Sequence, residues 1–425
     1  MTRRAEPDPH ALSRRRFLGT AGAAGALGAA AAIGGVPLVR SSAAGAATGS
    51  SGASGVVPFE GTHQAGIVTP VQDRLLFASF DVVTDDRAEL VDLLRAWTVA
   101  SRRMTAGLPV GTLNDDQDLP PDDTGEAVGL GPSSLTVTFG FGTSLFTRPG
   151  DPFAIAAKRP DALFPMPLFA RDEIQPDRSE GDLAVQACAD DPTVAFHAIR
   201  DLARIGRGVV ALRWSQLGFG RTSVTDEAQV TPRNLMGFKD GTNNIVVENT
   251  HDLERHVWVG PGDAPAWMRG GTYLVTRRIR MMLEIWDRST LADQEQTIGR
   301  DKREGAPLGA IHEHDPIDLT AERHGELVVP ETAHIRLAAP AENDGTRLLR
   351  RGFSFTDGID PVTNQLDAGL FFIAFQRDPR TGFVRVQRHL AQDALNEYIR
   401  HDSSGTFACP PGVGAAGYVG ETLFG

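Results

Sequence analysis

The order in which strand-like and helix-like segments follow one another restricts the fold of this chain more than any other feature. Every second residue from Leu135 to Phe141 is apolar, which is typical of a strand with one buried face, whereas Leu90, Leu94 and Trp97 recur at helical spacing. Such patterns predict, in order, a strand at 74–83, a helix at 85–104, strands at 135–141 and 183–187, a helix at 192–205 and a strand at 209–217. This β-α-β-β-α-β order is the ferredoxin-like arrangement, so we expect an α+β fold.

The second half of the chain repeats this rhythm less cleanly. Strands are expected at 273–282, 334–338, 353–356 and 369–376, and helices at 291–298 and 390–399. We therefore predict two ferredoxin-like domains, residues 58–245 and 246–425, each with an antiparallel sheet and packed helices. No repeat is visible in the sequence itself, so the duplication rests on element order alone. The Gly/Ser-rich residues 48–57 are expected to form a flexible leader.

The N-terminus has the parts of a cleavable export signal. The pair Arg15-Arg16 stands directly before Phe-Leu, an apolar Ala/Gly-rich run follows over residues 19–39, and Ala-Gly-Ala at 44–46 offers a cleavage site. An arginine pair in this place favours the twin-arginine route, which carries folded proteins. Residues 1–47 are therefore predicted to be a signal peptide, and the mature protein is expected in the periplasm or secreted.

Charge and cysteine content exclude several classes of function. The formal net charge of −12 argues against nucleic acid or an anionic membrane as a partner. Cys188 and Cys409 are the only cysteines, which excludes a cysteine-based zinc or iron–sulfur site, although the two could form a disulfide outside the cytoplasm. Any metal must therefore be held by histidine, carboxylate or a prosthetic group.

Three short segments carry side chains suited to chemistry. In Gly237–Asn244, glycines on both sides of Asp240 let the backbone hold the carboxylate in one direction, although an Asx-turn at a domain junction would use the same residues. His334 stands in an apolar run, where a structural histidine is the alternative to a ligand. Arg350 and Arg351 stand beside another apolar run, where a solvated surface is the alternative.

Together, and at these separations, the segments resemble the dye-decolourising (DyP-type) peroxidases, in particular a branch exported by the twin-arginine route and associated with iron acquisition. The resemblance runs along nearly all of the mature chain, through Gly61–Ile67, Gln186–Pro192, Gly237–Asn244, Gly270–Val275 and the segments at His334 and Arg350. It implies two ferredoxin-like domains, one haem b bound mainly by the second, and reduction of hydrogen peroxide with oxidation of small organic reductants or dyes. It also leaves room for a homo-oligomer and for an iron-uptake system as a partner.

The resemblance implies a role for each candidate residue. His334 would be the proximal ligand of the haem iron, with Asp393 accepting a hydrogen bond from its other nitrogen; ordinary charge on a helix surface is the alternative for Asp393. Asp240 would take a proton from one oxygen of hydrogen peroxide and return one to the other. Arg350 would stabilise the charge that develops, while alternation along the strand turns Arg351 to the other face. Because an aspartate base works in acid, the pH optimum is expected to be acidic.

Further residues are implied less directly. Arg300 would pair with a haem propionate, and a surface arginine is the alternative. Gly352 stands where a sister branch carries Asn, so the Asp–Arg pair must act without an amide beside it. Five aromatic residues could relay electrons to bulky dyes, although a place in the core is the better explanation for each: Trp258, Trp267, Trp286, Tyr273 and Tyr398.

Two other functions compete with peroxidase activity. Deferrochelation, the release of iron from haem with the porphyrin left intact, would use the same pocket. A non-enzymatic haem- or iron-binding protein would instead draw on His312 and His314, although two histidines on a predicted loop are more simply explained as solvated.

Overall fold

The structure is a computed structural model that describes residues 55–111, 116–263 and 265–425. The predicted signal peptide at 1–47 lies outside the described residues, as does the leader at 48–57 apart from residues 55–57. Within the described ranges, no helix combines the length and the apolar character needed to cross a membrane.

The first half forms the predicted ferredoxin-like unit. In chain order its main elements are β1 (Arg74–Val82), α1 (Arg87–Thr105), β2 (Thr136–Gly142), β3 (Leu183–Ala189), α3 (Pro192–Ile205) and β4 (Val210–Arg221). Both helices begin at an aspartate, because Asp86 accepts a hydrogen bond from Ala88 N and Asp191 accepts one from Thr193 N. The strands pair antiparallel in the order β2-β3-β1-β4, which is the ferredoxin-like sheet.

The second half builds a sheet of the same topology. Its long strands are β5 (Thr272–Met281), β9 (Phe353–Ile359), β10 (Leu366–Gln376) and β11 (Ile399–Cys409). They lie in the order β9-β10-β5-β11, which repeats the first sheet strand for strand. Four of the helices in this half are α5 (Leu283–Trp286), α6 (Leu291–Ile298), α7 (His334–Leu337) and α8 (Phe383–His389). The α+β prediction with two ferredoxin-like units is therefore confirmed.

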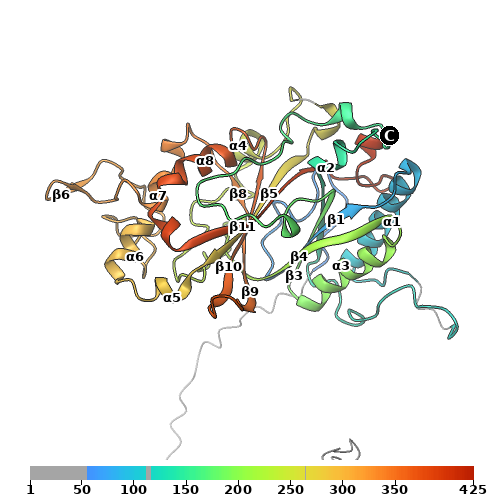
Figure 1. The fold of residues 1–425 in the computed structure, drawn as a ribbon, viewed down its shortest axis with the longest axis horizontal. Coiled ribbons are helices and arrows are strands. Elements are labelled where there is room, and N and C mark those ends of the chain that lie inside the picture. Colours follow the sequence, from blue (N-terminus) through green and yellow to red (C-terminus); the bar gives the residue numbers. More distant parts are fainter. Residues whose placement is uncertain (1–54, 112–115, 264) are drawn as a thin grey trace, which may run out of the picture. The chain divides into compact units, whose positions relative to one another are not determined.

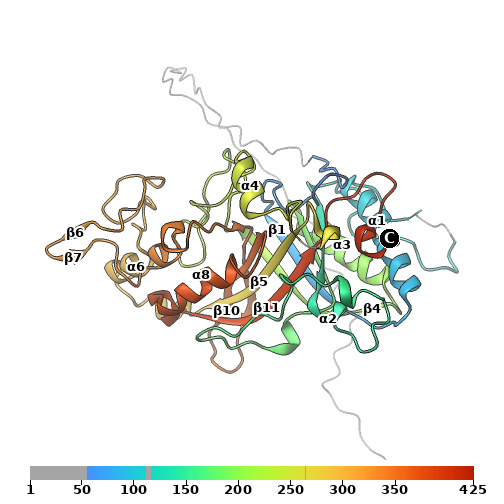
Figure 2. The same cartoon turned by 90° about the horizontal axis from the view of Figure 1, so that it is seen from above.

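The two sheets join edge to edge into a closed ring. β4 pairs with β9, and β11 pairs with β2, while the short strand β8 (Leu349–Arg350) adds to β10. Figures 1 and 2 both show the strands in the middle, with α1 and α3 on one side and α6 and α8 on the other. The remaining short elements are α2 (Thr143–Phe146), α4 (Thr250–His256), α9 (Glu421–Phe424), β6 (Glu322–Arg323) and β7 (Glu326–Leu327). Because the sheet is continuous across both halves, the domain boundary at 245/246 stays a prediction.

Closure of the ring buries both faces of its strands. On β1, Leu76 packs toward the core under α1 and α3, whereas Leu75 and Phe77 belong to a second core shared with the other half. The expectation of a single buried face at 135–141 is wrong for the same reason, because Thr136 and Thr138 on the opposite face of β2 are buried as well. The alternation in the sequence marked the more apolar of two buried faces.

Two elements of the second half differ from the sequence prediction. The segment at 334–338, expected as a strand, is the short helix α7, because its backbone bonds locally, with Leu337 N donating to Ala333 O. The helix expected at 390–399 is replaced by two 3-10 turns, Leu390–Gln392 and Ala394–Glu397, followed by β11. β11 escaped prediction because it carries the polar run at 401–404, which is buried in the folded protein.

Both cysteines lie in the core shared by the two halves. Cys188 on β3 and Cys409 on β11 are buried free thiols, so the disulfide that the sequence left open is not formed. Burial raises the pKa of both thiols, which makes them poor nucleophiles.

Candidate active site

One largely apolar cavity brings the predicted site residues together. Asp240, Arg300, His334, Arg350 and Asp393 all line it. Most of the remaining wall is aliphatic or aromatic and includes Phe238, Ile279, Met281, Leu370, Phe372 and Phe383. Every residue that the sequence singled out for catalysis or cofactor binding therefore faces the same space.

The loop around Asp240 fixes the direction of its carboxylate. Gly241 has a φ of +102°, and a β-carbon there would lie 2.9 Å from the backbone Cα of Ser223, so glycine is required. The carboxylate accepts a hydrogen bond from Arg350 Nη1 at 2.9 Å and another from Asn234 Nδ2 at 3.3 Å. The acidic group is thus held by both its backbone and its partners.

Arg350 lies on β8, and its backbone is clamped by Asn244. The Asn244 Oδ1 atom accepts a hydrogen bond from Arg350 N at 2.8 Å, and Asn244 Nδ2 donates to Arg350 O at 2.8 Å. Asn244 is buried and also donates to Val224 O. Arg351 is fully buried, does not line the cavity and donates to Thr69 O, so the predicted alternation of the two arginines is confirmed.

His334 begins α7 and is held from behind by Asp393. The distance between His334 Nδ1 and Asp393 Oδ2 is 2.6 Å, and the other oxygen of the buried Asp393 accepts a hydrogen bond from Leu395 N. Burial disfavours the charged imidazole, but the charge and hydrogen bond of Asp393 outweigh it and raise the pKa of His334. About a third of the side chain, 35%, stays accessible in the cavity wall. Asp393 is therefore not helix-surface charge; it orients an imidazole.

Arg300 is buried rather than exposed. Its Nη1 atom donates to Gly305 O at 2.6 Å and to Glu313 O at 2.9 Å, and the residue is 7% exposed. Burial lowers the pKa of the guanidinium, against the opposing charge of Glu313. The surface-arginine alternative is wrong, and pairing with a propionate stays a prediction.

The segment at 312–314 supports the Asp240 loop through Glu313. Lys239 Nζ and Thr242 Oγ1 donate to the carboxylate of Glu313, and these bonds lower the pKa of Glu313 although burial opposes them. His314 is exposed, 3.7 Å from the same carboxylate. Among the described residues, neither His312 nor His314 belongs to a group with metal-ligand spacing.

Sequence reasoning missed three residues that hold the site together: Asn234, Asn244 and Glu313. Asn244 ends the quoted Gly-rich segment, but nothing in the sequence marked its contact with Arg350. Asn234 and Glu313 carried no signal for support, because their partners become neighbours only in the folded chain.

The cavity suits a haem. A large flat macrocycle needs apolar walls, an axial nitrogen donor and cations near its carboxylates. The described residues supply the apolar wall, the Nε2 atom of His334, for which they offer no hydrogen-bond partner, and the guanidinium of Arg300. This donor set agrees with the cofactor that the resemblance implied.

Comparison with known proteins gives the same answer. The chain matches the Dyp-type peroxidase N-terminal model over residues 64–220 and the Dyp-type peroxidase C-terminal model over residues 231–414. It is 38% identical over 372 residues to the deferrochelatase of Escherichia coli strain 536, which covers 86% of each chain.

Solved structures of similar proteins share the fold. DtpA from Streptomyces lividans matches with a TM-score of 0.79 and 44% identity, over 88% of this chain and 98% of that one. A DyP-type peroxidase from Cellulomonas bogoriensis matches with a TM-score of 0.77 and 39% identity, over 87% and 98%. The chain therefore belongs to the DyP-type peroxidase family and is a haem peroxidase, which reduces hydrogen peroxide and oxidises organic substrates.

Proposed function

We propose that His334 holds haem b in this cavity and that Asp240 and Arg350 are the catalytic residues for hydrogen peroxide. The observation that carries the proposal is the convergence of two pairs on one apolar space. Asp240 and Arg350 are joined at 2.9 Å, and His334 and Asp393 at 2.6 Å. An acid–base group (Asp240), a fixed cation (Arg350) and an oriented imidazole (His334) thus line the cavity in which a haem would bind.

The residues of the chain would manage protons and charge while the haem supplies redox-active iron. As a carboxylate, Asp240 would take a proton from one oxygen of hydrogen peroxide and deliver it to the other, which then leaves as water. The haem would supply the two electrons that cleavage of the O–O bond requires and would accept the remaining oxygen. The guanidinium of Arg350 presents several N–H donors and would stabilise negative charge on the departing oxygen. Asn234 and the glycine-bounded loop keep the carboxylate aimed during both transfers.

An optical spectrum before and after one equivalent of hydrogen peroxide tests the assignment. The wild-type protein should show a Soret band that changes on mixing. His334→Ala should lower the haem content of the purified protein, because the axial nitrogen is lost. Unchanged haem content and an unchanged Soret band in this variant would rule out His334 as the ligand.

Deferrochelation is the second candidate, and the 38% identity to proteins named deferrochelatase supports it. The same cavity would serve both activities. Incubating the haem-loaded protein with a reductant and no peroxide, and measuring porphyrin fluorescence, separates them. Formation of metal-free porphyrin would favour iron release and an iron-uptake system as a partner. Stable haem together with fast peroxide turnover would show peroxidase activity without iron release.

We also propose that the protein is exported by the twin-arginine route, on the strength of residues 1–47. Replacing Arg15 and Arg16 by lysine should retain the protein in the cytoplasm. Export of His334→Ala would then show whether haem must be bound before the protein crosses the membrane.

The oligomeric state is a separate question. Light scattering of the purified protein distinguishes a monomer from the homo-oligomer that the resemblance allows.

A further inference from the structure

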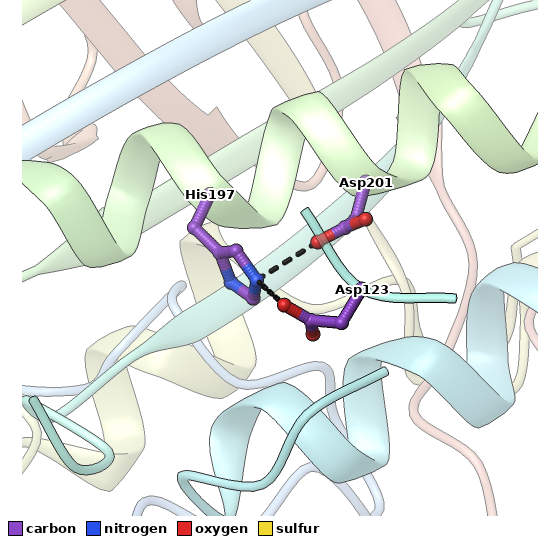
Figure 3. A group of neighbouring side chains, drawn as sticks. All are labelled: Asp123, His197 and Asp201. Atoms are coloured by element: carbon purple, nitrogen blue, oxygen red, sulfur yellow. Dashed lines mark hydrogen bonds and ion pairs between the residues drawn. The ribbon is translucent and has the colours of Figure 1, made fainter. Parts of the chain in front are cut away.

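A second group of ligand-type side chains lies outside the haem cavity. Figure 3 shows His197 and Asp201 on the same helix, α3, with Asp123 pointing toward them from the loop before β2. The three residues are 4%, 0% and 2% exposed, respectively. One ligand atom from each lies within 4.8 Å of the others. Nothing in the peroxidase chemistry uses this group.

One ring nitrogen of His197 lies within hydrogen-bond distance of two carboxylate oxygens. Its Nε2 atom lies 2.8 Å from Asp201 Oδ2 and 3.0 Å from Asp123 Oδ1. A ring nitrogen carries at most one hydrogen and cannot donate a full hydrogen bond to both oxygens. Ligand atoms bound at ~2.0–2.2 Å around a tetrahedral zinc ion lie roughly 3.4 Å apart, so each of these two pairs would have to move apart by roughly 0.4–0.6 Å to hold one.

An oxygen in the group also has no partner. Asp201 is fully buried, and its Oδ1 atom makes no hydrogen bond within the described part of the chain. Thr124 brings a further oxygen, since its hydroxyl lies 3.1 Å from Asp201 Oδ2. A buried carboxylate oxygen without a donor is costly, and a bound cation would remove that cost.

The local charge is negative as well. Asp123 and Asp201 bring two carboxylates against one imidazole, and the nearby Glu126 is paired with Arg200 at 3.2 Å. Even a protonated His197 leaves one carboxylate uncompensated. A divalent cation with a neutral imidazole balances both.

We propose that Asp123, His197 and Asp201 bind one zinc ion, with the Thr124 hydroxyl or the second oxygen of Asp201 as the fourth ligand. A compact set of one nitrogen and a few oxygens suits Zn²⁺, whereas Ca²⁺ takes six to eight oxygens and Mg²⁺ keeps several waters. The site is structural: Asp123 also accepts hydrogen bonds from Val110 N and Gly125 N, so the ion ties this loop to α3.

Calorimetric titration of the chelator-stripped, haem-loaded, full-length protein with zinc chloride tests the proposal. One zinc per chain should bind and raise the melting temperature. Asp201→Asn keeps the shape of the side chain but removes its charge. It should weaken binding by more than the ~10–100-fold that loss of an outer partner costs, and abolish the thermal shift. The double variant His312→Gln/His314→Gln removes two exposed histidines and should bind zinc like the wild type.

X-ray absorption at the zinc edge on the wild-type protein gives an answer even if Asp201→Asn fails to fold. It should report a single imidazole nitrogen, with oxygen ligands at ~2.0–2.2 Å. Absence of zinc uptake, unchanged affinity in Asp201→Asn, lost affinity in the histidine double variant, or two or more imidazoles around the metal would each overturn the proposal.

Discussion

At the scale of single residues, each side chain that we propose for haem binding or catalysis is paired with one that holds it in place. Asp393 accepts a hydrogen bond from His334, and the carboxylate of Asp240 accepts hydrogen bonds from both Asn234 and Arg350. All five residues line the same cavity. Loss of Asp240 should therefore stop proton transfer, whereas loss of a supporting residue such as Asn234 should move the reacting group out of position.

Asp240→Asn should separate chemistry from binding. The amide keeps the size of the side chain but accepts no proton, so the reaction with hydrogen peroxide should slow by ~10²–10⁴-fold while haem content is retained. Stopped-flow mixing of the haem-loaded variant with peroxide measures the rate. Asp263→Asn, which alters an ion pair with Arg377, serves as the matched control and should react normally. A fast Asp240→Asn variant, or a wild-type rate maximum near or above neutral pH, would remove Asp240 as the base.

At the scale of elements, local signals in the sequence decided which helices could be predicted. The bounds of α3 and α6 agree with the prediction because both helices carry their own start and stop signals. Thr290 caps α6, and Gly299 ends it with a φ of +89°. The conformations of α7 and β11 depend instead on contacts with residues that are distant in the sequence. A short stretch of sequence does not reveal these contacts.

The same reasoning applies to the site. Asp240, His334 and Arg350 were identified because they belong to motifs, and Asp393 because of its position relative to family members. The contact between His334 and Asp393 joins residues 59 positions apart, and Asn244 reaches Arg350 across 106 positions. Residues that support a site through such long-range contacts have no local sequence pattern by which they could be identified.

Asn244 joins the Asp240 loop to β8, so its replacement should misplace Arg350. Asn244→Asp keeps the acceptor for Arg350 N but loses the donor to Arg350 O and Val224 O, whereas Asn244→Ala loses both. Each buried group left unpaired costs ~1–3 kcal/mol, so both variants should melt at lower temperature, with Ala worse. If Asn244 positions Arg350, kcat/KM for peroxide should fall in the same order while KM for the reducing substrate stays constant. A loss of stability with an unchanged kcat/KM would reduce Asn244 to a purely structural role.

At the scale of the whole molecule, the strands of the closed ring carry buried ionisable groups. Arg278 on β5 is 2% exposed and donates to Asp367 at 2.7 Å and to Asp357 at 2.9 Å. It also pairs with Asp402, from the polar run of β11. The segment that looked least like a strand thus supplies a partner for a buried cation. The stability of the ring should therefore respond to pH through groups remote from the haem.

Glu180 is the partly buried acid for which this response is clearest. Its Oε2 atom accepts a hydrogen bond from Thr406 N on β11, and its carbonyl accepts one from Trp214 on β4. Burial raises the pKa of Glu180 from 4.5 to about 7, against the hydrogen bond of Thr406 and the charges of Arg213 and Arg277. The folded protein thus holds a proton that the unfolded chain has released.

Because the folded state binds more protons between pH 4.5 and about 7, the free energy of unfolding should fall as the pH rises through this window. The loss amounts to up to roughly 3 kcal/mol and levels off above the folded pKa. Glu180→Gln keeps an acceptor for Thr406 N and cannot ionise, so its stability should lack this fall and exceed that of the wild type at pH 8. Denaturant unfolding across the pH range measures both, and the exposed Glu254→Gln variant should follow the wild-type curve. If Glu180→Gln follows it too, the pH response of the ring comes from other groups.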